Sequence, residues 1–157
     1  MNYDENHLVK DFALRTQENL RLVKKLENNP DYRFFEVTQL INSMLGLLVF
    51  PKVAFINKFP NKLLSELEKE GWPRIVLLEG DAPCNDLQAL INYLRNAIAH
   101  FNLKFLSKDG QNISGLELWN IPYHSDRVNW RVRLSLDDLR TITDKFIDLI
   151  KKVDENG

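Results

Sequence analysis

Apolar residues recur along the chain with the period of amphipathic helices. In several long segments an apolar side chain returns every three or four residues, so that one side of each helix would face a core. Proline and glycine residues lie at or just beyond the ends of several of these segments, as expected where helices stop. The predicted helices span residues 6–27, 34–50, 61–70 and 85–101, and the last begins after the capping sequence Ser135-Leu136-Asp137-Asp138.

The helix predicted over residues 85–101 begins with a capping signal. Asn85 can accept a hydrogen bond from the first turn, and Gln88, three residues later, can reach back to the Asn85 main chain. At roughly 100° per residue, this helix has one apolar side and one polar side. The apolar side holds Leu87, Leu90, Ile91, Leu94, Ala97, Ile98 and Phe101, and the polar side holds Gln88, Asn92, Arg95, Asn96, Ala99 and His100.

Beyond residue 101 the period changes from helical to alternating. Residues 128–134 alternate apolar and polar side chains, the pattern of a strand with one buried face. The pair Asp109-Gly110 is a strong hairpin-turn signal between short strands at residues 103–107 and 113–119. The sequence therefore predicts a mainly α protein. Its core is an antiparallel four-helix bundle, with a small β-hairpin or three-stranded sheet inserted before the C-terminal helix.

Length and charge limit the classes of protein that fit. With 157 residues and 44% hydrophobic content, the chain can bury one core but is too short for two ordinary domains, so we expect a single domain over residues 1–157. A formal net charge of −1 excludes nucleic-acid binding through bulk positive charge. RNA would need a local patch, for which Arg131 and Arg133 on the polar side of the 128–134 strand are the candidates. The alternative is that both simply face solvent. In either case Trp130, on the apolar side of this strand, is expected in the core.

The remaining composition indicates neither a metal site nor a secreted or membrane protein. Cys84 is a single cysteine without a ligand cluster around it, so we expect no disulfide, no metal and a structural thiol. No secretory signal is recognisable at the N-terminus, which predicts a cytoplasmic location. The apolar run at residues 34–50 contains polar residues such as Glu36 and Asn42, so a helix within the bundle is expected and not a membrane span.

Two side chains suited to phosphate chemistry lie near the end of the 85–101 helix. Arg95 and His100 fall at opposite edges of its polar side, about 140° apart, so one copy of the helix cannot easily close both on one phosphate. A two-fold dimer would bring Arg95, Asn96 and His100 from both chains around one composite pocket. This geometry predicts an obligate homodimer.

At these residues the chain resembles the HEPN family. The hallmark of that family is Arg, four to six residues and then His, very often with Asn directly after the Arg, and Arg95-Asn96-Ala97-Ile98-Ala99-His100 fits it. The apolar run from Phe34 to Lys52 looks like the second core helix of small stand-alone HEPN proteins. The resemblance implies an all-helical dimer and a metal-independent endoribonuclease without a cofactor, of the kind found among toxins and antiviral effectors. Its expected partners are RNA and an antitoxin or other regulatory protein. In one HEPN branch, a tyrosine two residues beyond the His receives a nucleotide. This chain has Asn102 at that position, so modification by that route is not expected.

The chemistry implied by the resemblance follows from the side chains. A neutral imidazole at His100 can take the proton from a ribose 2′-OH, and the Arg95 guanidinium can hold the phosphate through two hydrogen bonds. Asn96 would orient His100 or the phosphate. The products would carry a 2′,3′-cyclic phosphate and a 5′-hydroxyl.

A second polar stripe lies on the helix predicted over residues 34–50. Glu36, Gln39, Ser43 and Gly46 share one side of this otherwise apolar helix. The stripe could face the Asn92 edge of the motif helix, with Glu36 paired to Arg95, or a dimer partner; it could equally face solvent. The residues predicted to bind substrate are Glu36, Asn92, Arg131 and Arg133.

Two other functions are compatible with the same sequence. A HEPN-like dimer could bind RNA, a nucleotide or a partner protein through this cleft without cleaving anything. A purely structural helical dimer could use Arg95 and His100 as ordinary surface or interface residues. Only the enzyme would leave cyclic-phosphate ends.

Overall fold

The computed structural model describes residues 8–26, 29–31, 35–51, 53–110 and 112–155. The chain divides into two compact units. Unit 1 comprises Met1–Phe59 and Thr143–Gly157, and unit 2 comprises Pro60–Ile142. The predicted helix boundaries at Asn6, Glu27 and Phe34 lie outside the described residues.

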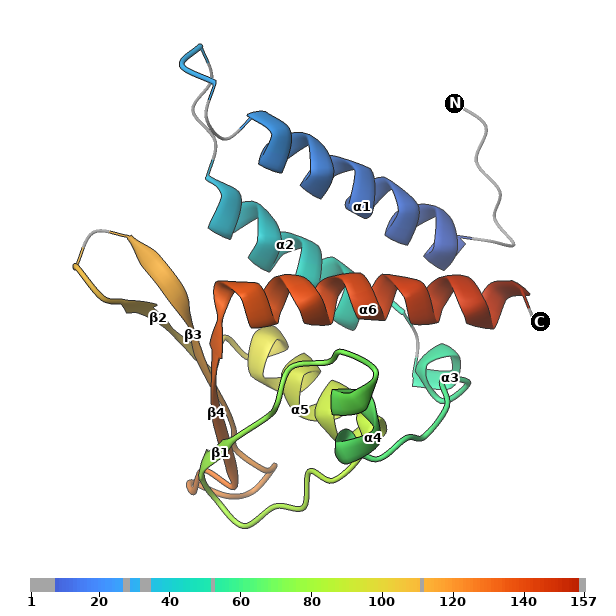
Figure 1. Ribbon diagram of the computed structural model, residues 1–157. Helices are drawn as coiled ribbons and strands as arrows, with labels where there is room; N and C mark the ends of the chain where they lie inside the picture. Colours follow the sequence, from blue (N-terminus) through green and yellow to red (C-terminus); the bar gives the residue numbers. More distant parts are fainter. Residues whose placement is uncertain (1–7, 27–28, 32–34, 52, 111, 156–157) are drawn as a thin grey trace. The chain divides into compact units, whose positions relative to one another are not determined.

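Unit 1 is helical. It contains α1 (Leu8–Leu26), α2 (Glu36–Val49), the short α3 (Val53–Ile56) and the part of α6 (Leu136–Glu155) that follows Ile142 (Figure 1). The long helices lie where the apolar period predicted them, whereas α3 falls between the helices predicted over residues 34–50 and 61–70, where the sequence predicted none. Within the unit, the Lys151 ammonium on α6 donates a hydrogen bond to Gln17 Oε1 on α1 at 2.9 Å.

A close approach between α1 and α2 explains the small residues on α2. A Cβ atom at Gly46 would lie 2.6 Å from Cζ of Phe12, so only glycine admits the Phe12 ring there. Phe12 also stacks on Phe50, with ring centroids 5.1 Å apart. Ser43 is buried as well. Solvent exposure of the polar stripe is therefore wrong for Ser43 and Gly46, which lie within the packing of unit 1.

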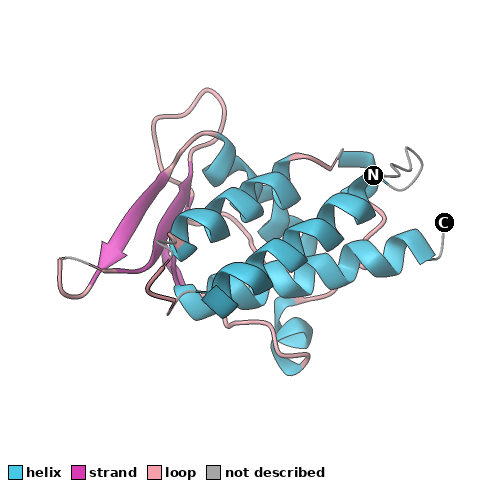
Figure 2. Ribbon diagram, turned by 90° about the horizontal axis from the view of Figure 1, so that it is seen from above, coloured by secondary structure: helices cyan, strands magenta, loops and turns pink. Residues whose placement is uncertain are grey.

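Unit 2 contains an antiparallel four-stranded sheet with the order β1-β4-β3-β2. Its strands, magenta in Figure 2, are β1 (Leu77–Glu79), β2 (Leu103–Ser107), β3 (Ile113–Asn120) and β4 (Trp130–Ser135). The predicted turn between β2 and β3 is confirmed. Gly110 adopts φ +75°, and Asp109 Oδ1 accepts a hydrogen bond from the Asn112 amide at 2.7 Å.

The two faces of this sheet have different compositions. The inner face packs against α5 (Leu87–Ala99), where the Tyr93 ring stacks on fully buried Trp130 at 5.2 Å. This confirms the prediction that Trp130 belongs to the core. The outer face carries the charged residues of β3 and β4. The buried inner-face side chains are Leu116, Leu118, Trp130, Val132 and Leu134, and the outer face carries Lys104, Glu117, Trp119, Arg131 and Arg133.

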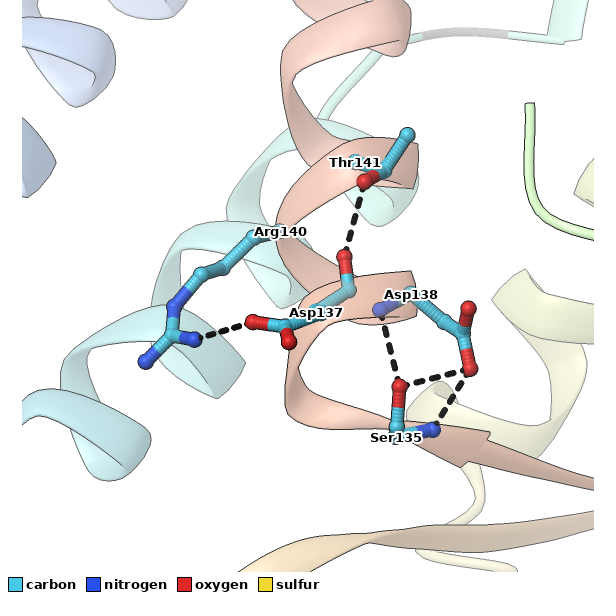
Figure 3. Close-up of polar contacts among 5 residues, drawn as sticks. All are labelled: Ser135, Asp137, Asp138, Arg140 and Thr141. Carbon is cyan, nitrogen blue, oxygen red and sulfur yellow. Dashed lines mark hydrogen bonds and ion pairs between the residues drawn. The ribbon is translucent and has the colours of Figure 1, made fainter. Parts of the chain in front are cut away.

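Side-chain caps fix where the helices of unit 2 begin. The short α4 (Leu64–Lys69) starts where Glu66 accepts a hydrogen bond from the Leu63 amide at 3.0 Å. At the start of α6, Ser135 Oγ accepts from the Asp138 amide at 3.1 Å, and Asp138 Oδ2 accepts from the Ser135 amide at 2.8 Å (Figure 3). This reciprocal capping box at Ser135 is the one that the sequence predicted.

The predicted fold class is wrong. The protein is a mixed α/β structure with a four-stranded sheet, and not a mainly α four-helix bundle with two or three strands. The missing strand is β1, whose three residues are all exposed and pair with β4 through an irregular register. Three residues are too few to show an alternation of apolar and polar side chains. The strand is defined by its pairing with the free edge of β4, which its own sequence does not reveal.

Candidate functional site

The helix that carries the Arg-His motif, α5, is anchored at its first turn by Asp86. The Asp86 carboxylate accepts a hydrogen bond from the Ala89 amide at 2.9 Å. The predicted cap at Asn85 is therefore wrong by one residue. The Asn85 carbonyl oxygen instead accepts from the Leu64 amide at 2.8 Å, because this residue is paired with the segment before α4.

The apolar side predicted for α5 is confirmed apart from its last residue. The motif residues lie outside the core: Asn96 and His100 are exposed and Arg95 is half-buried. Asn92, one turn before Asn96, is exposed too. The buried residues of α5 are Leu87, Leu90, Ile91, Leu94, Ala97 and Ile98.

His100 occupies the C-terminal cap of α5. Its amide donates to the Asn96 carbonyl at 3.0 Å, which joins the two motif residues through the main chain. The next two amides turn back onto the helix: Phe101 N–H donates to Ile98 O at 3.1 Å and Asn102 N–H to Ala97 O at 2.8 Å. These two bonds form a Schellman motif, which ends the helix after Ala99 and places His100 at the C-cap position.

Phe101 departs from the prediction that placed it on the apolar side. Its side chain is 72% exposed and its φ is +55°. The helix stops at Ala99, so the helical period no longer applies at Phe101, and the left-handed turn directs its ring away from the core.

The predicted substrate-binding residues Arg131 and Arg133 both converge on Glu117. Arg133 Nε lies 2.7 Å from Glu117 Oε2, and Arg131 Nη1 lies 2.9 Å from Glu117 Oε1. Arg131 also pairs with Glu79 at 2.7 Å and lies over the Trp119 ring. The hydrogen bonds from Arg133 and then Arg131 lower the pKa of the buried Glu117 carboxyl.

The two arginines therefore do not simply face solvent. Arg131 is largely committed to its two carboxylate partners, whereas the Arg133 side chain remains 61% exposed. The sequence interpretation missed Glu117, although the alternation Leu116-Glu117-Leu118 could have placed its side chain on the outer face, opposite Arg133.

Glu36 lies in the first turn of α2, in unit 1, whereas Arg95 belongs to unit 2. Its predicted contact with Arg95 therefore stays a prediction.

Cys84 is half-buried beside the core of unit 2. Burial raises the pKa of its thiol to about 11, against an opposing contribution from the Trp130 indole, and the charge of Asp86 adds to the increase. A thiol with so high a pKa is a poor nucleophile at neutral pH, which fits a structural role.

The residues that the structure describes include neither a cluster of metal ligands nor an apolar helix of membrane-spanning length. They contain no group of three or more His, Cys, Asp or Glu side chains placed to hold a metal ion. Among the helices described, none is long and apolar enough to cross a membrane.

Comparison with known proteins identifies the family. The chain matches the family model described as HEPN pEK499 p136 over residues 1–156. It therefore belongs to the HEPN class of proteins and, within it, to the pEK499 p136 family. No curated protein and no solved structure matches the chain. The family match covers both units and includes the Arg-Asn-x3-His motif of α5.

Proposed function

We propose that this protein is an endoribonuclease of the HEPN type, with Arg95, Asn96 and His100 as its catalytic residues. The observation that carries this proposal is the motif itself: in a chain that belongs to the family, Asn96 and His100 lie exposed at the end of a capped helix whose other side is buried. Side chains that are kept out of the core at a helix end are free to meet a large polymeric substrate.

The three side chains divide the reaction between them. His100 takes the proton from a ribose 2′-OH, and the 2′-oxygen attacks the adjacent phosphorus. The bond to the 5′-oxygen breaks, and that oxygen takes a proton from solvent. Arg95 offsets the negative charge that grows on the phosphate, and Asn96 orients the phosphate or the imidazole. The products are a 2′,3′-cyclic phosphate and a 5′-hydroxyl, and the residues supply this chemistry without a metal ion or cofactor.

The active site is composite and lies between two copies of the chain. Arg95 is half-buried on the flank of α5 whereas His100 caps its end, so the two differ in both direction and exposure. A two-fold dimer through the motif helices supplies both groups to one phosphate. Mixing inactive Arg95→Ala with inactive His100→Ala protein should restore part of the cleavage activity, because some mixed dimers contain an intact pair. No recovery after subunit exchange would argue against a composite site.

The substrate is cellular RNA, bound in addition by Asn92, Arg131 and Arg133, and Glu36 is a further candidate for substrate binding. As the family resemblance implies, the biological role is that of a toxin or anti-phage effector, held in check by an antitoxin or another regulatory protein. Such an enzyme would act in the cytoplasm, where Cys84 stays reduced.

Cleavage of single-stranded RNA by the purified protein tests this proposal. Arg95→Ala and His100→Ala should each abolish cleavage while leaving the dimer intact, and RNA with 2′-deoxyribose at the cleavage point should resist. His124→Ala is the matched control, because His124 is an exposed histidine of unit 2 outside α5. RNA binding without new ends would instead indicate a non-catalytic dimer. Normal cleavage by His100→Ala would refute the site assignment.

A further inference from the structure

Phe101, the residue directly after His100, holds a large apolar ring in solvent at an energetic cost. Its side chain is 72% exposed, and its backbone is left-handed with φ +55°. In a Schellman motif this position is most often glycine, because a Cβ atom is disfavoured in that conformation. Phenylalanine therefore brings strain here without the compensation of a buried ring. Strain of this kind is found where a side chain serves a function.

The residue after Phe101 is joined through its main chain to the sheet. Asn102 follows Phe101, and its carbonyl oxygen accepts a hydrogen bond from the Trp119 amide at 3.1 Å. Trp119 lies opposite Arg131 in the register of β3 and β4, and the Arg131 guanidinium lies 5.4 Å from the centre of its ring. The end of α5 therefore adjoins a row that combines an aromatic ring with a cation.

The next row of the outer face adds two exposed cations. Lys104 on β2 and Arg133 on β4 both lie opposite Glu117 on β3, and opposite residues of an antiparallel pair share a face. Lys104 is exposed and the Arg133 side chain is 61% exposed. Glu117 and Glu79 offset part of this charge, so the surface is only mildly basic.

We propose that Phe101 is a substrate-binding residue that stacks on an unpaired base of single-stranded RNA next to the ribose whose 2′-OH His100 deprotonates. This inference rests on the proposed ribonuclease function and deepens it. Aromatic rings bind bases of any sequence by stacking, and cations nearby hold the backbone phosphates. A base within a duplex has both faces covered by its neighbours, so the ring selects unpaired RNA.

The proposed dimer brings the two motif helices together, so contact with the second copy is the alternative that the test must separate from RNA binding. Stable protein interfaces bury a broad surface with an apolar centre. The chain neighbours of Phe101, His100 and Asn102, are instead polar. The outer face beyond Asn102 combines Trp119 with the charged residues Lys104, Glu117 and Arg131. An exposed aromatic ring next to the proposed phosphate site matches a nucleotide base.

The test measures RNA binding and stability in the same variant. In a His100→Ala background, which cannot cleave, Phe101→Gly should weaken binding of a short fluorescein-labelled single-stranded RNA by about tenfold. The same change should raise the midpoint of thermal unfolding, because glycine accepts the left-handed conformation without strain. A ring with a merely structural role would give the opposite stability change. Phe105→Ala is the control, because Phe105 is 46% exposed on β2 but lies opposite Leu116 of the inner face.

Several outcomes would overturn the inference. Unchanged RNA affinity in Phe101→Gly would do so, as would equal weakening in Phe105→Ala. A loss of binding that tracks dissociation into monomers, measured by sedimentation, would make Phe101 a subunit contact. The proposed nuclease function fails separately, if the wild-type protein leaves no cyclic-phosphate ends while the stacking effect on binding remains. Wild-type protein that cleaves normally, with an unchanged KM in Phe101→Gly, would refute the stacking role alone.

Discussion

The Arg133 guanidinium donates a hydrogen bond to the Glu117 carboxylate at 2.7 Å, between residues that lie directly opposite each other on β4 and β3. Glu117 is 7% exposed, and Arg131 donates to its other carboxylate oxygen at 2.9 Å. A buried carboxylate that lost these donors would retain an uncompensated charge. The pair therefore holds together the outer face of the sheet that adjoins the end of the motif helix.

Glu117→Gln should lower the free energy of unfolding by about 1–3 kcal/mol at neutral pH, because two charge-assisted hydrogen bonds are lost and one arginine partner is largely exposed. The change should also flatten the acid side of the stability profile. The folded-state pKa of Glu117 is lowered, so its stabilisation is complete above the ordinary carboxyl pKa and is lost as pH falls through the lower folded value. Urea unfolding between about pH 7 and pH 3 measures both effects.

Glu68→Gln is the control for this experiment, because Glu68 is an exposed carboxylate on α4. It should leave both the free energy of unfolding and its pH dependence nearly unchanged. Equal acid sensitivity in Glu117→Gln and wild-type protein would show that the carboxylate does not stabilise the sheet.

A second prediction concerns the contribution of the α5 N-cap to stability. Asp86→Ala should lower the free energy of unfolding by about 1 kcal/mol, because the Ala89 amide loses its acceptor. Asp86→Asn should retain most of the stability, since asparagine caps helices equally well. Asn85→Ala should have little effect, because Asn85 takes part through its main-chain carbonyl. Thermal or urea unfolding of the three variants checks the assignment, and a larger loss in Asn85→Ala would contradict it.

A third prediction concerns the reactivity of the Cys84 thiol. Because burial raises its pKa to about 11, the folded protein should react with iodoacetamide about a hundredfold more slowly than the protein unfolded in urea at the same mildly alkaline pH. Mass spectrometry of timed samples measures the two rates. Rapid labelling of the folded protein would show instead that Cys84 is a reactive thiol.

Local patterns predicted those parts of the fold that depend on nearby residues. The buried side of α5 follows from its helical period, and the burial of Trp130 follows from alternation along β4. The capping box at Ser135 was readable because it needs only a four-residue sequence. In each case the spacing alone determines which side chain faces the core or the helix end.

Features that depend on distant pairing could not be predicted in the same way. β1 exists because β4 offers it a free edge, so its three residues carry no pattern of their own. No local pattern identifies the partners of Glu117 either, because its contact with Arg133 depends on the register of β3 against β4.

The candidate site shows the same division. The sequence placed Arg95, Asn96 and His100 on the polar side of one helix, because their spacing decides that placement. The exposure of Phe101 was missed, because it depends on where the helix stops. That end point is set by the turn after His100 and by the pairing of Asn102 with Trp119, neither of which has a short sequence signal.

The measurement that tests the central claim most directly is a map of RNA ends in growing cells. Wild-type protein and His100→Ala would be expressed separately, total RNA extracted, and new ends bearing a 2′,3′-cyclic phosphate located. The ribonuclease account predicts such ends, together with slowed growth, for the wild-type protein only. Identical RNA ends and equal growth for the two proteins would contradict it.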